Sequence, residues 1–150
     1  MNDEAVGDVT AGNYASLSRA WQAGDTVRLS LPIRYLEAHP YVFEATGRVA
    51  LARGPLNYCA EGLDQGVEPR DLIVPDKPEQ LEAVSSGEFG GAVLLQAQAF
   101  AESPDMDYLY RLVEARDHNQ LISTTLTAIP YYSWANRKPS PIQVWLRQPG

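Results

Sequence analysis

Apolar and polar residues alternate with a period of two along much of this chain, and this rhythm restricts the fold more than any other feature. In the run "TVRLSLPI" (26–33), every second residue from Val27 to Ile33 is apolar, and "YASLSRAW" (14–21) alternates in the same way. Successive side chains of a strand point to opposite faces, so the two runs predict a hairpin with one buried face. Pro32 cannot donate to a ladder, which places it at a strand end or a sheet edge.

Further runs predict more strands, separated by Gly and Pro. We expect a turn at Thr46-Gly47 and another at "RGP" (53–55), with strands on either side. The sequence predicts one strand through Val49 and Leu51, another from 56 to 60, and a short one in "DLIV" (71–74). It predicts further strands at 91–100, 121–134 and 142–147. The segment "SGEFGG" (86–91) reads as a hairpin turn. "SPDMDYLYRLVEAR" (103–116) fits either a helix capped by Ser103 or a further strand.

These elements predict a mostly β fold, an antiparallel β-sandwich of the jelly-roll-like kind, with one short helix near 104–115. The turn-rich segment 63–80 holds three prolines and is the one plausible boundary. Residues 1–62 would then be part of one sandwich module and 81–150 a second one. Packing of the whole chain as one domain is the alternative.

Composition removes several classes of function. The chain has 150 residues, is 45% hydrophobic and carries a net charge of −7. The negative charge and scattered basic residues disfavour nucleic-acid binding. No apolar run approaches the roughly 18 residues of a membrane helix. The N-terminus "MNDEAVGDVT" lacks the features of a signal peptide. We expect a soluble protein, with a cytoplasmic location slightly favoured and the compartment otherwise undecided.

Few residues suggest chemistry of their own. The single cysteine, Cys59, excludes an internal disulfide and a CxxC metal site. Its apolar surroundings favour a small buried residue over a nucleophile. His39 precedes a proline and reads as a turn histidine with a structural hydrogen bond, while His118 lies in a polar turn. The acidic residues, Asp64 among them, fall mostly in turns, where solvated carboxylates are the default.

The segment "AIPYYSWANRKPSPIQVWLR" (128–147) is the strongest candidate for contacts. Tyr131, Tyr132, Trp134 and Arg137 are candidate sugar or interface contacts, because Tyr and Trp offer large rigid faces with a polar edge. If the strand continued to Trp134, Tyr131 and Ser133 would face one side, and Tyr132 and Trp134 the other. That alternation favours packing in a core or between modules over a ligand platform.

Two long motifs resemble a known family. "GNYASLSRAWQAGDTVRLSLPIRYLEAHPYV", followed by "GRVALARGPLNYCAEGLD", resembles the middle β-sandwich module of glycoside hydrolase family 127, the β-L-arabinofuranosidase-like enzymes. The close, "LTAIPYYSWANRKPSPIQVWLR", resembles the C-terminal module of that family. The match covers most of the chain, and 65–120 is its least distinctive part. "NDEAV" resembles a turn within the middle module, so the resemblance implies a chain that begins partway into it, with an exposed edge that favours pairing.

The resemblance implies a role without a catalytic site. Members carry an (α/α)6 barrel with a cysteine nucleophile, a zinc held by cysteines and a glutamate, and a glutamate as acid/base. No barrel, adjacent cysteine pair or Glu-x-Cys occurs in this sequence, so neither catalytic nor metal residues carry over, and no cofactor is expected in the chain.

We therefore expect a non-catalytic region that braces the barrel, as a domain or a separate chain, and that mediates dimerisation. A carbohydrate-binding module with aromatics near 131–134 is the alternative, and an enzyme with a site of its own is a third hypothesis. The resemblance also places 128–147 as the closing hairpin of a sandwich. Pro139 and Pro141 would stiffen its loop, and Asn136 and Arg137 would fix that loop by hydrogen bonds.

Overall fold

The computed structural model describes residues 5–7, 9–10, 12–102, 110 and 121–149. The chain divides into two compact units, Met1–Leu31 and Pro32–Gly150, which are described separately. The helix expected near 104–115 lies outside the described residues, apart from the exposed Tyr110. His118 lies outside them as well.

The described residues of the first unit contain no strand, so the predicted hairpin of 14–21 and 26–33 is wrong. A turn is present instead, in which the Asp25 N–H donates to the Gln22 carbonyl at 3.1 Å. Alternation yields a stable strand pair only where the apolar face is covered. Within this unit that face is open to solvent, since Val27 is 56% and Leu29 is 74% exposed.

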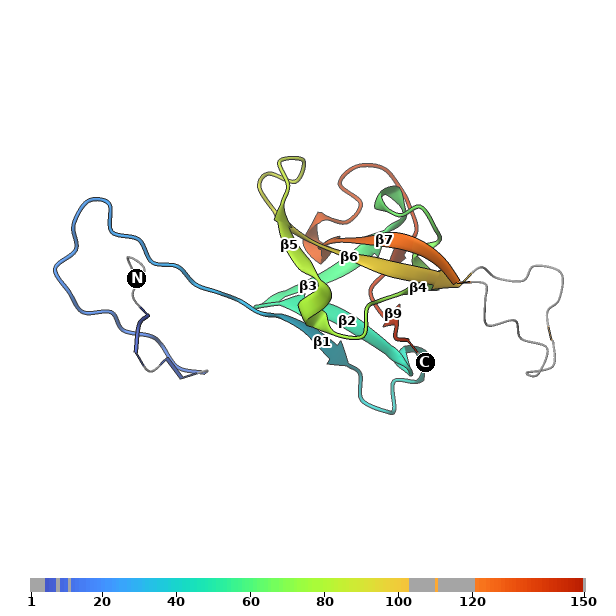
Figure 1. The fold of residues 1–150 in the computed structure, drawn as a ribbon, viewed down its shortest axis with the longest axis horizontal. Coiled ribbons are helices and arrows are strands. Elements are labelled where there is room, and N and C mark those ends of the chain that lie inside the picture. Colours follow the sequence, from blue (N-terminus) through green and yellow to red (C-terminus); the bar gives the residue numbers. More distant parts are fainter. Residues whose placement is uncertain (1–4, 8, 11, 103–109, 111–120, 150) are drawn as a thin grey trace. The chain divides into compact units, whose positions relative to one another are not determined.

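The described residues of the second unit form nine strands, most of which are labelled in Figure 1. They are β1 (Ile33–Glu37), β2 (Arg48–Arg53), β3 (Leu56–Glu61), β4 (Leu72–Ile73), β5 (Glu82–Ser85), β6 (Val93–Glu102), β7 (Leu121–Pro130), β8 (Ile142–Gln143) and β9 (Leu146–Arg147). Short 3-10 turns join them: η1 (Phe43–Ala45), η2 (Gly62–Asp64), η3 (Pro69–Asp71), η4 (Pro78–Gln80) and η6 (Tyr131–Ser133). None of the described helical segments is long and apolar enough to cross a bilayer.

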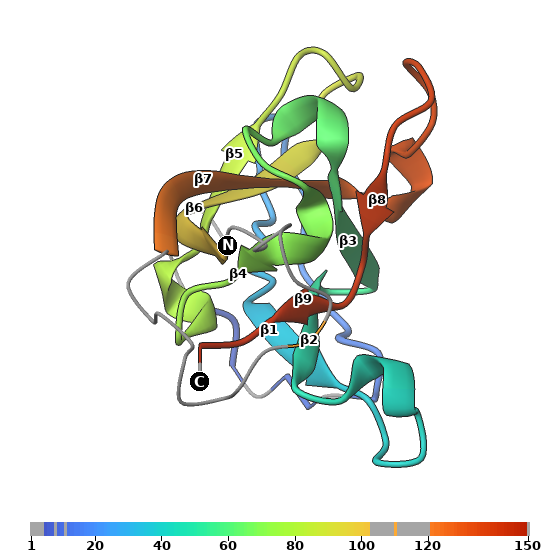
Figure 2. The same cartoon turned by 90° about the vertical axis from the view of Figure 1, so that its right-hand side faces the viewer.

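The strands form one mixed sheet in the order β1-β2-β9-β4-β6-β7-β3-β8, with β5 beside β6. Every pairing in the described residues is antiparallel except that of β4 with β9. Strand β2 pairs with β9 near its start and with β3 at its end, so the sheet folds around a shared core (Figure 2). This sandwich-like, mostly antiparallel fold confirms the predicted class.

The main hydrophobic core of the second unit lies inside this folded sheet. Its buried side chains come from β2, β3, β4, β6, β7 and β9, and include Leu51, Leu95, Leu126 and Leu146. In β6 the residues alternate, with Leu95 and Ala99 inside and Gln98 outside, as expected for a half-buried strand. The unit Pro32–Gly150 includes both sides of the segment 63–80.

Several predicted turns are confirmed. Gly47 and Gly54 have φ of 68° and 58°, conformations that favour glycine, at the two expected turns flanking β2. The "SGEFGG" segment joins β5 to β6, and the Ser86 N–H donates to the Ala92 carbonyl at 2.9 Å. The "DLIV" strand is present as the two-residue β4.

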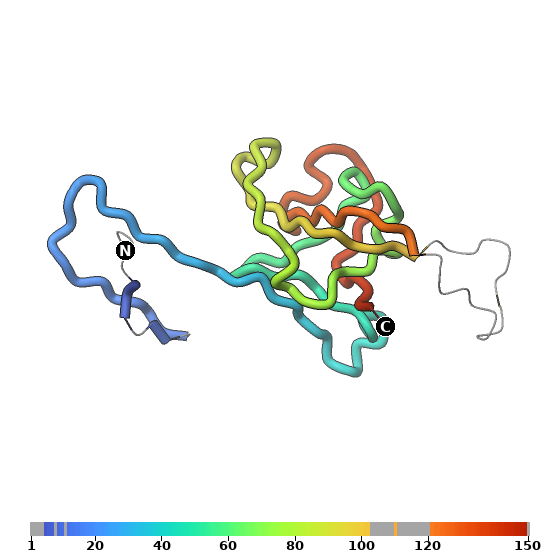
Figure 3. The backbone as a smooth tube through the Cα atoms, in the orientation of Figure 1, coloured from blue at the N-terminus to red at the C-terminus, as the bar shows by residue number. Residues whose placement is uncertain are grey.

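The predicted closing hairpin is wrong. Strand β8 pairs with β3, which lies between β7 and β8, and the run 142–147 is broken into β8 and β9. The break has a local cause: side chains of Arg48 and Gln143 donate to the Trp145 carbonyl, at 3.0 and 2.7 Å. Beyond it β9 turns away to lie between β2 and β4, so the last strand returns to the first part of the sheet (Figure 3).

Candidate functional site

The candidate site is the aromatic loop, residues 131–141, which connects β7 to β8. Strand β7 ends at Pro130, and η6 turns the backbone, with the Trp134 N–H donating to the Tyr131 carbonyl at 3.2 Å. Because a 3-10 turn replaces the strand here, the alternation expected for residues 131–134 does not hold. Proline at 130 caps the strand, since it offers no N–H for a further ladder bond.

All three predicted aromatics of the loop lie at the surface. Tyr131, Tyr132 and Trp134 are 48%, 61% and 37% exposed, while Ser133 between them is buried. The rings of Tyr131 and Trp134 stand 6.1 Å apart between centroids, tilted by 30°. Aromatic rings at this separation support each other, so the two side chains present a joint face.

The backbone after Trp134 takes an unusual conformation. Ala135 has a φ of 61°, in the left-handed region that residues with a Cβ rarely adopt. The Asn136 side-chain amide donates to the Tyr132 carbonyl at 3.3 Å and closes the turn. The prediction that Asn136 fixes this loop is therefore confirmed.

Arg137 fastens the loop to the sheet. Its guanidinium binds both oxygens of Asp64, at 2.8 and 2.5 Å, and Glu61 Oε2 at 2.5 Å. It also lies over the Phe89 ring, 4.8 Å from the centroid. Asp64 and Glu61 hold the pKa of Arg137 above its ordinary value, so it stays charged. The predicted role of Arg137 in fixing the loop is confirmed, and its donors point at the protein itself.

Glu61 has a role that the sequence pattern did not predict. It is fully buried at the end of β3, and its second oxygen accepts a hydrogen bond from Ser140 Oγ at 3.1 Å. Alternation along β3 offered a signal, since Glu61 lies on the face of Cys59, which was expected to be buried. Asp64 was expected to be a solvated turn residue. That expectation is wrong, because Arg137 pairs with it below the surface.

A shallow hollow adjoins this cluster, with a volume of about 400 Å³. It is lined by Leu63, Glu88, Arg137 and Lys138. Glu88 Oε1 stands 3.6 Å from Arg137 Nη1, and Lys138 adds a second positive charge, so charges of both signs line the hollow. The hollow therefore has no strong preference for a charged ligand.

Cys59 and His39 have structural roles. Cys59 is fully buried in β3, and burial, with the charges of Glu61 and Asp64, raises the pKa of its thiol to about 12. It stays protonated at neutral pH, so the interpretation as a buried small residue is confirmed. His39 Nδ1 accepts a hydrogen bond from the Tyr41 N–H at 3.3 Å, as expected of a turn histidine.

The described residues offer no suitable set of zinc ligands. No group of three or more His, Cys, Asp and Glu side chains within them could hold a metal ion. The nearest approach to a carboxylate cluster, Glu61 with Asp64, is already bound by Arg137. Zinc prefers thiolate and imidazole ligands, and the one cysteine here is a buried thiol.

The fold and the site together define an all-β module whose aromatic loop is fixed by a buried ion-pair cluster. The glycoside hydrolase family 127 C-terminal domain matches residues 33–147. The chain belongs to this family, as its C-terminal domain, which confirms the resemblance to glycoside hydrolase family 127.

Relatives and solved structures agree with this assignment. A non-reducing end β-L-arabinofuranosidase of Bifidobacterium longum subsp. longum is 31% identical over 133 residues, which are 84% of this chain and 20% of that protein. The crystal structure of a family 127 β-L-arabinofuranosidase from Geobacillus stearothermophilus T6 is similar, with a TM-score of 0.67 and 34% identity over 79% of this chain and 18% of that one. A family 127 β-arabinofuranosidase structure has a TM-score of 0.63 and 30% identity over 80% and 19%. The chain thus spans about a fifth of these relatives.

Proposed function

We propose that this chain is the non-catalytic C-terminal β-domain of a glycoside hydrolase similar to β-L-arabinofuranosidases, and that it braces the catalytic barrel of that enzyme. The observation that carries the proposal is the aromatic loop, whose Tyr131, Tyr132 and Trp134 remain exposed while Arg137 fixes the loop from below. The chain's small share of its relatives' length supports a partner region that holds the reaction.

The loop has the properties of a docking surface. Exposed Tyr and Trp side chains are enriched at protein interfaces, because they bury much area and keep a polar edge for hydrogen bonds. A loop already ordered by Arg137 and Asn136 loses little further conformational entropy on binding. A bracing contact through these side chains is therefore favourable.

Binding of the separately produced catalytic barrel of the parent enzyme tests the bracing role. We expect the two parts to associate in calorimetry, and Trp134→Ala to weaken association by roughly 30-fold or more, the effect of an interface hot spot. Tyr41→Ala is the matched control, because Tyr41 is 82% exposed and lies outside the loop. Equal affinities for the wild type and Trp134→Ala would refute docking through this loop.

Dimerisation is the second part of the proposal: in the chain without a barrel, the same exposed aromatics are free to bury each other across two copies. Size-exclusion chromatography with light scattering would detect it. We expect a dimer that dissociates in Trp134→Ala, and monomers at every concentration would exclude this part while leaving the bracing role intact.

Carbohydrate binding by the aromatic loop is the second candidate function, favoured by the joint face of Tyr131 and Trp134. Sugars stack on such faces, and binding would change tryptophan fluorescence. Titration with arabinose oligosaccharides tests this candidate, and an unchanged spectrum of the folded wild type would exclude it.

In this proposal the chain has neither catalytic activity nor a zinc ion of its own, since the chemistry belongs to the barrel. An assay on p-nitrophenyl arabinofuranosides, with metal analysis of the purified chain, tests both points. We expect no hydrolysis and no bound zinc. Hydrolysis that disappears in Cys59→Ser would instead assign an active site to this chain.

A further inference from the structure

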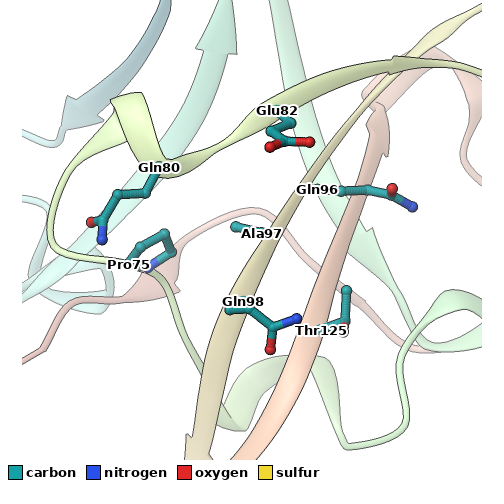
Figure 4. Close-up of a pocket in the computed structure, with 7 residues that line it drawn as sticks. All are labelled: Pro75, Gln80, Glu82, Gln96, Ala97, Gln98 and Thr125. Carbon is teal, nitrogen blue, oxygen red and sulfur yellow. The ribbon is translucent and has the colours of Figure 1, made fainter.

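A polar cleft of about 440 Å³ lies on the second unit, and none of the aromatic-loop residues 131–141 lines it (Figure 4). We call it the amide cleft. It is lined by Pro75, Gln80, Glu82, Gln96, Ala97, Gln98 and Thr125. Its volume falls within the range of small-molecule sites in proteins.

The cleft has a topological cause. Along one edge, β6 pairs first with β5, as far as Gln96 opposite Glu82, and then with β4, from Phe100 opposite Ile73. Residues 97–99 lie between these two paired stretches, so neither β5 nor β4 pairs with them along this edge. The connection that contains Pro75 and Gln80 arches past this gap, so the hollow is bounded by it on one side and by β6 and β7 on the other (Figure 4).

Two walls of the cleft are held in place by hydrogen bonds. Gln80 Oε1 accepts from the Lys77 N–H at 3.0 Å, which leaves both protons of its amide nitrogen for a ligand. Gln96 Nε2 donates to Thr127 Oγ1 at 3.2 Å, which leaves its amide oxygen as an acceptor. The cleft therefore offers fixed donors and fixed acceptors at the same time.

The remaining polar groups extend this pattern. Gln98 is exposed, and its side-chain amide can both donate and accept hydrogen bonds. Glu82 adds a carboxylate, which accepts two hydrogen bonds at once, and Thr125 adds a hydroxyl. Pro75 supplies an apolar wall, and Tyr35 fixes it by donating its hydroxyl proton to the Pro75 carbonyl at 2.9 Å.

This chemistry selects among ligands. None of the lining residues is Lys, Arg or His, which disfavours phosphates and carboxylates, and a single carboxylate is a weak site for a cation. Hydroxyl groups both donate and accept hydrogen bonds. The amides, the carboxylate and the hydroxyl of the cleft can therefore bind several hydroxyl groups of one ligand at once. We propose that the amide cleft binds an uncharged saccharide, independently of the bracing role.

The test is a titration of the full-length, isotope-labelled chain followed by NMR, with methyl β-L-arabinofuranoside and methyl α-D-glucopyranoside as probes. We expect saturable shifts of the Ala97 and Gln98 backbone amides and of the Gln80 side-chain amide with at least one saccharide. Gln98→Ala and Glu82→Gln should each weaken binding roughly 2- to 10-fold, the effect of one lost hydrogen bond. Gln148→Ala, an exposed glutamine outside the cleft, and Trp134→Ala should leave the affinity unchanged.

Three results would overturn the assignment. The first is the absence of saturable cleft shifts with both saccharides, and the second is a response to spermidine alone, which would make the cleft a cation site. The third is loss of saccharide binding in Trp134→Ala, which would locate the sugar on the aromatic loop. Since Gln98 and Glu82 are exposed, their variants should keep the wild-type fold, which the same spectra report.

Discussion

At the scale of residues, Arg137 is the most consequential side chain of the second unit. Its guanidinium binds the fully buried Glu61 through one hydrogen bond and the mostly buried Asp64 through two. A carboxylate removed from water is tolerated only with such a partner, because its desolvation is otherwise uncompensated. The aromatic loop is therefore only as stable as this ion-pair cluster.

We predict that Arg137→Met lowers the free energy of unfolding by about 3–5 kcal/mol, the cost of leaving buried carboxylates unpaired. Urea denaturation followed by circular dichroism measures the change. The matched control is Arg70→Met, because Arg70 is mostly exposed and stands 3.8 Å from Asp71. An exposed pair contributes at most about 1 kcal/mol. Equal effects of the two substitutions would contradict the assigned importance of the cluster.

Cys59 gives the domain an alkaline dependence of stability. Its pKa in the folded chain, about 12, exceeds the ordinary value of 9.0, so the folded state binds more protons between these two pH values. The free energy of unfolding therefore falls as pH rises through this window. Urea titrations at pH 8 and pH 10 measure it, and Cys59→Ala should reduce the decline relative to wild type. Parallel pH curves for the two proteins would count against this explanation.

At the scale of elements, the aromatic loop combines a short 3-10 turn with one left-handed residue. Ala135 occupies a conformation that costs a residue with a Cβ about 1–2 kcal/mol. The hydrogen bonds of Asn136 and Arg137 on its C-terminal side offset that strain. The loop is thus held in a conformation that its local sequence does not prefer.

We predict that Ala135→Gly raises the free energy of unfolding by about 0.5–1 kcal/mol, since relief of strain exceeds the added chain entropy of glycine. Ala135→Val should lower it by about 1–2 kcal/mol, because a β-branched side chain fits the left-handed region worse. Thermal denaturation of both variants measures the difference. A gain in stability with valine would show that the residue is not strained.

Elements with strong local signals were predictable from the sequence. Strand β6 follows from alternation, β2 from its short apolar run between Arg48 and Arg53, and the turns at Gly47 and Gly54 from glycine. The hairpin at 14–33 was predicted wrongly. Alternation indicates which face of a strand must be buried, but it does not show whether another element covers that face. The pairing of β8 with β3 was not predicted either, since loop 131–141 is long enough to reach more than one edge of the sheet. The ion pairs of Arg137 with Glu61 and Asp64 join residues more than 70 positions apart and leave no local trace.

At the scale of the whole molecule, the two units differ in what holds them. The buried clusters of the core draw their residues from Val49 to Leu146, all within the second unit. In the described residues of the first unit, large apolar side chains such as Trp21 and Leu29 are exposed. Stability should therefore reside in the unit Pro32–Gly150.

We predict that a chain of residues 32–150 unfolds at the same urea concentration as the full chain, because it retains every core side chain. A chain that ends at 141 should fail to fold, since it lacks Leu146, which is fully buried between neighbouring strands. Circular dichroism of the two truncated chains, beside the full chain, measures both outcomes. A cooperative transition in the chain that ends at 141 would show that β8 and β9 are dispensable.

The position of β9 also bears on synthesis in the cell. This two-residue strand lies between β2 and β4 in the sheet, although it comes almost a hundred residues after β2 in the sequence. A nascent chain can form the β2–β3 corner and the long β6–β7 pair early, because those contacts are local. It cannot join β2 to β4 until residue 147 has emerged from the ribosome. Until then the edges of both strands stay open, so the domain completes its fold only at the end of translation of this region, when chaperone protection is of most use.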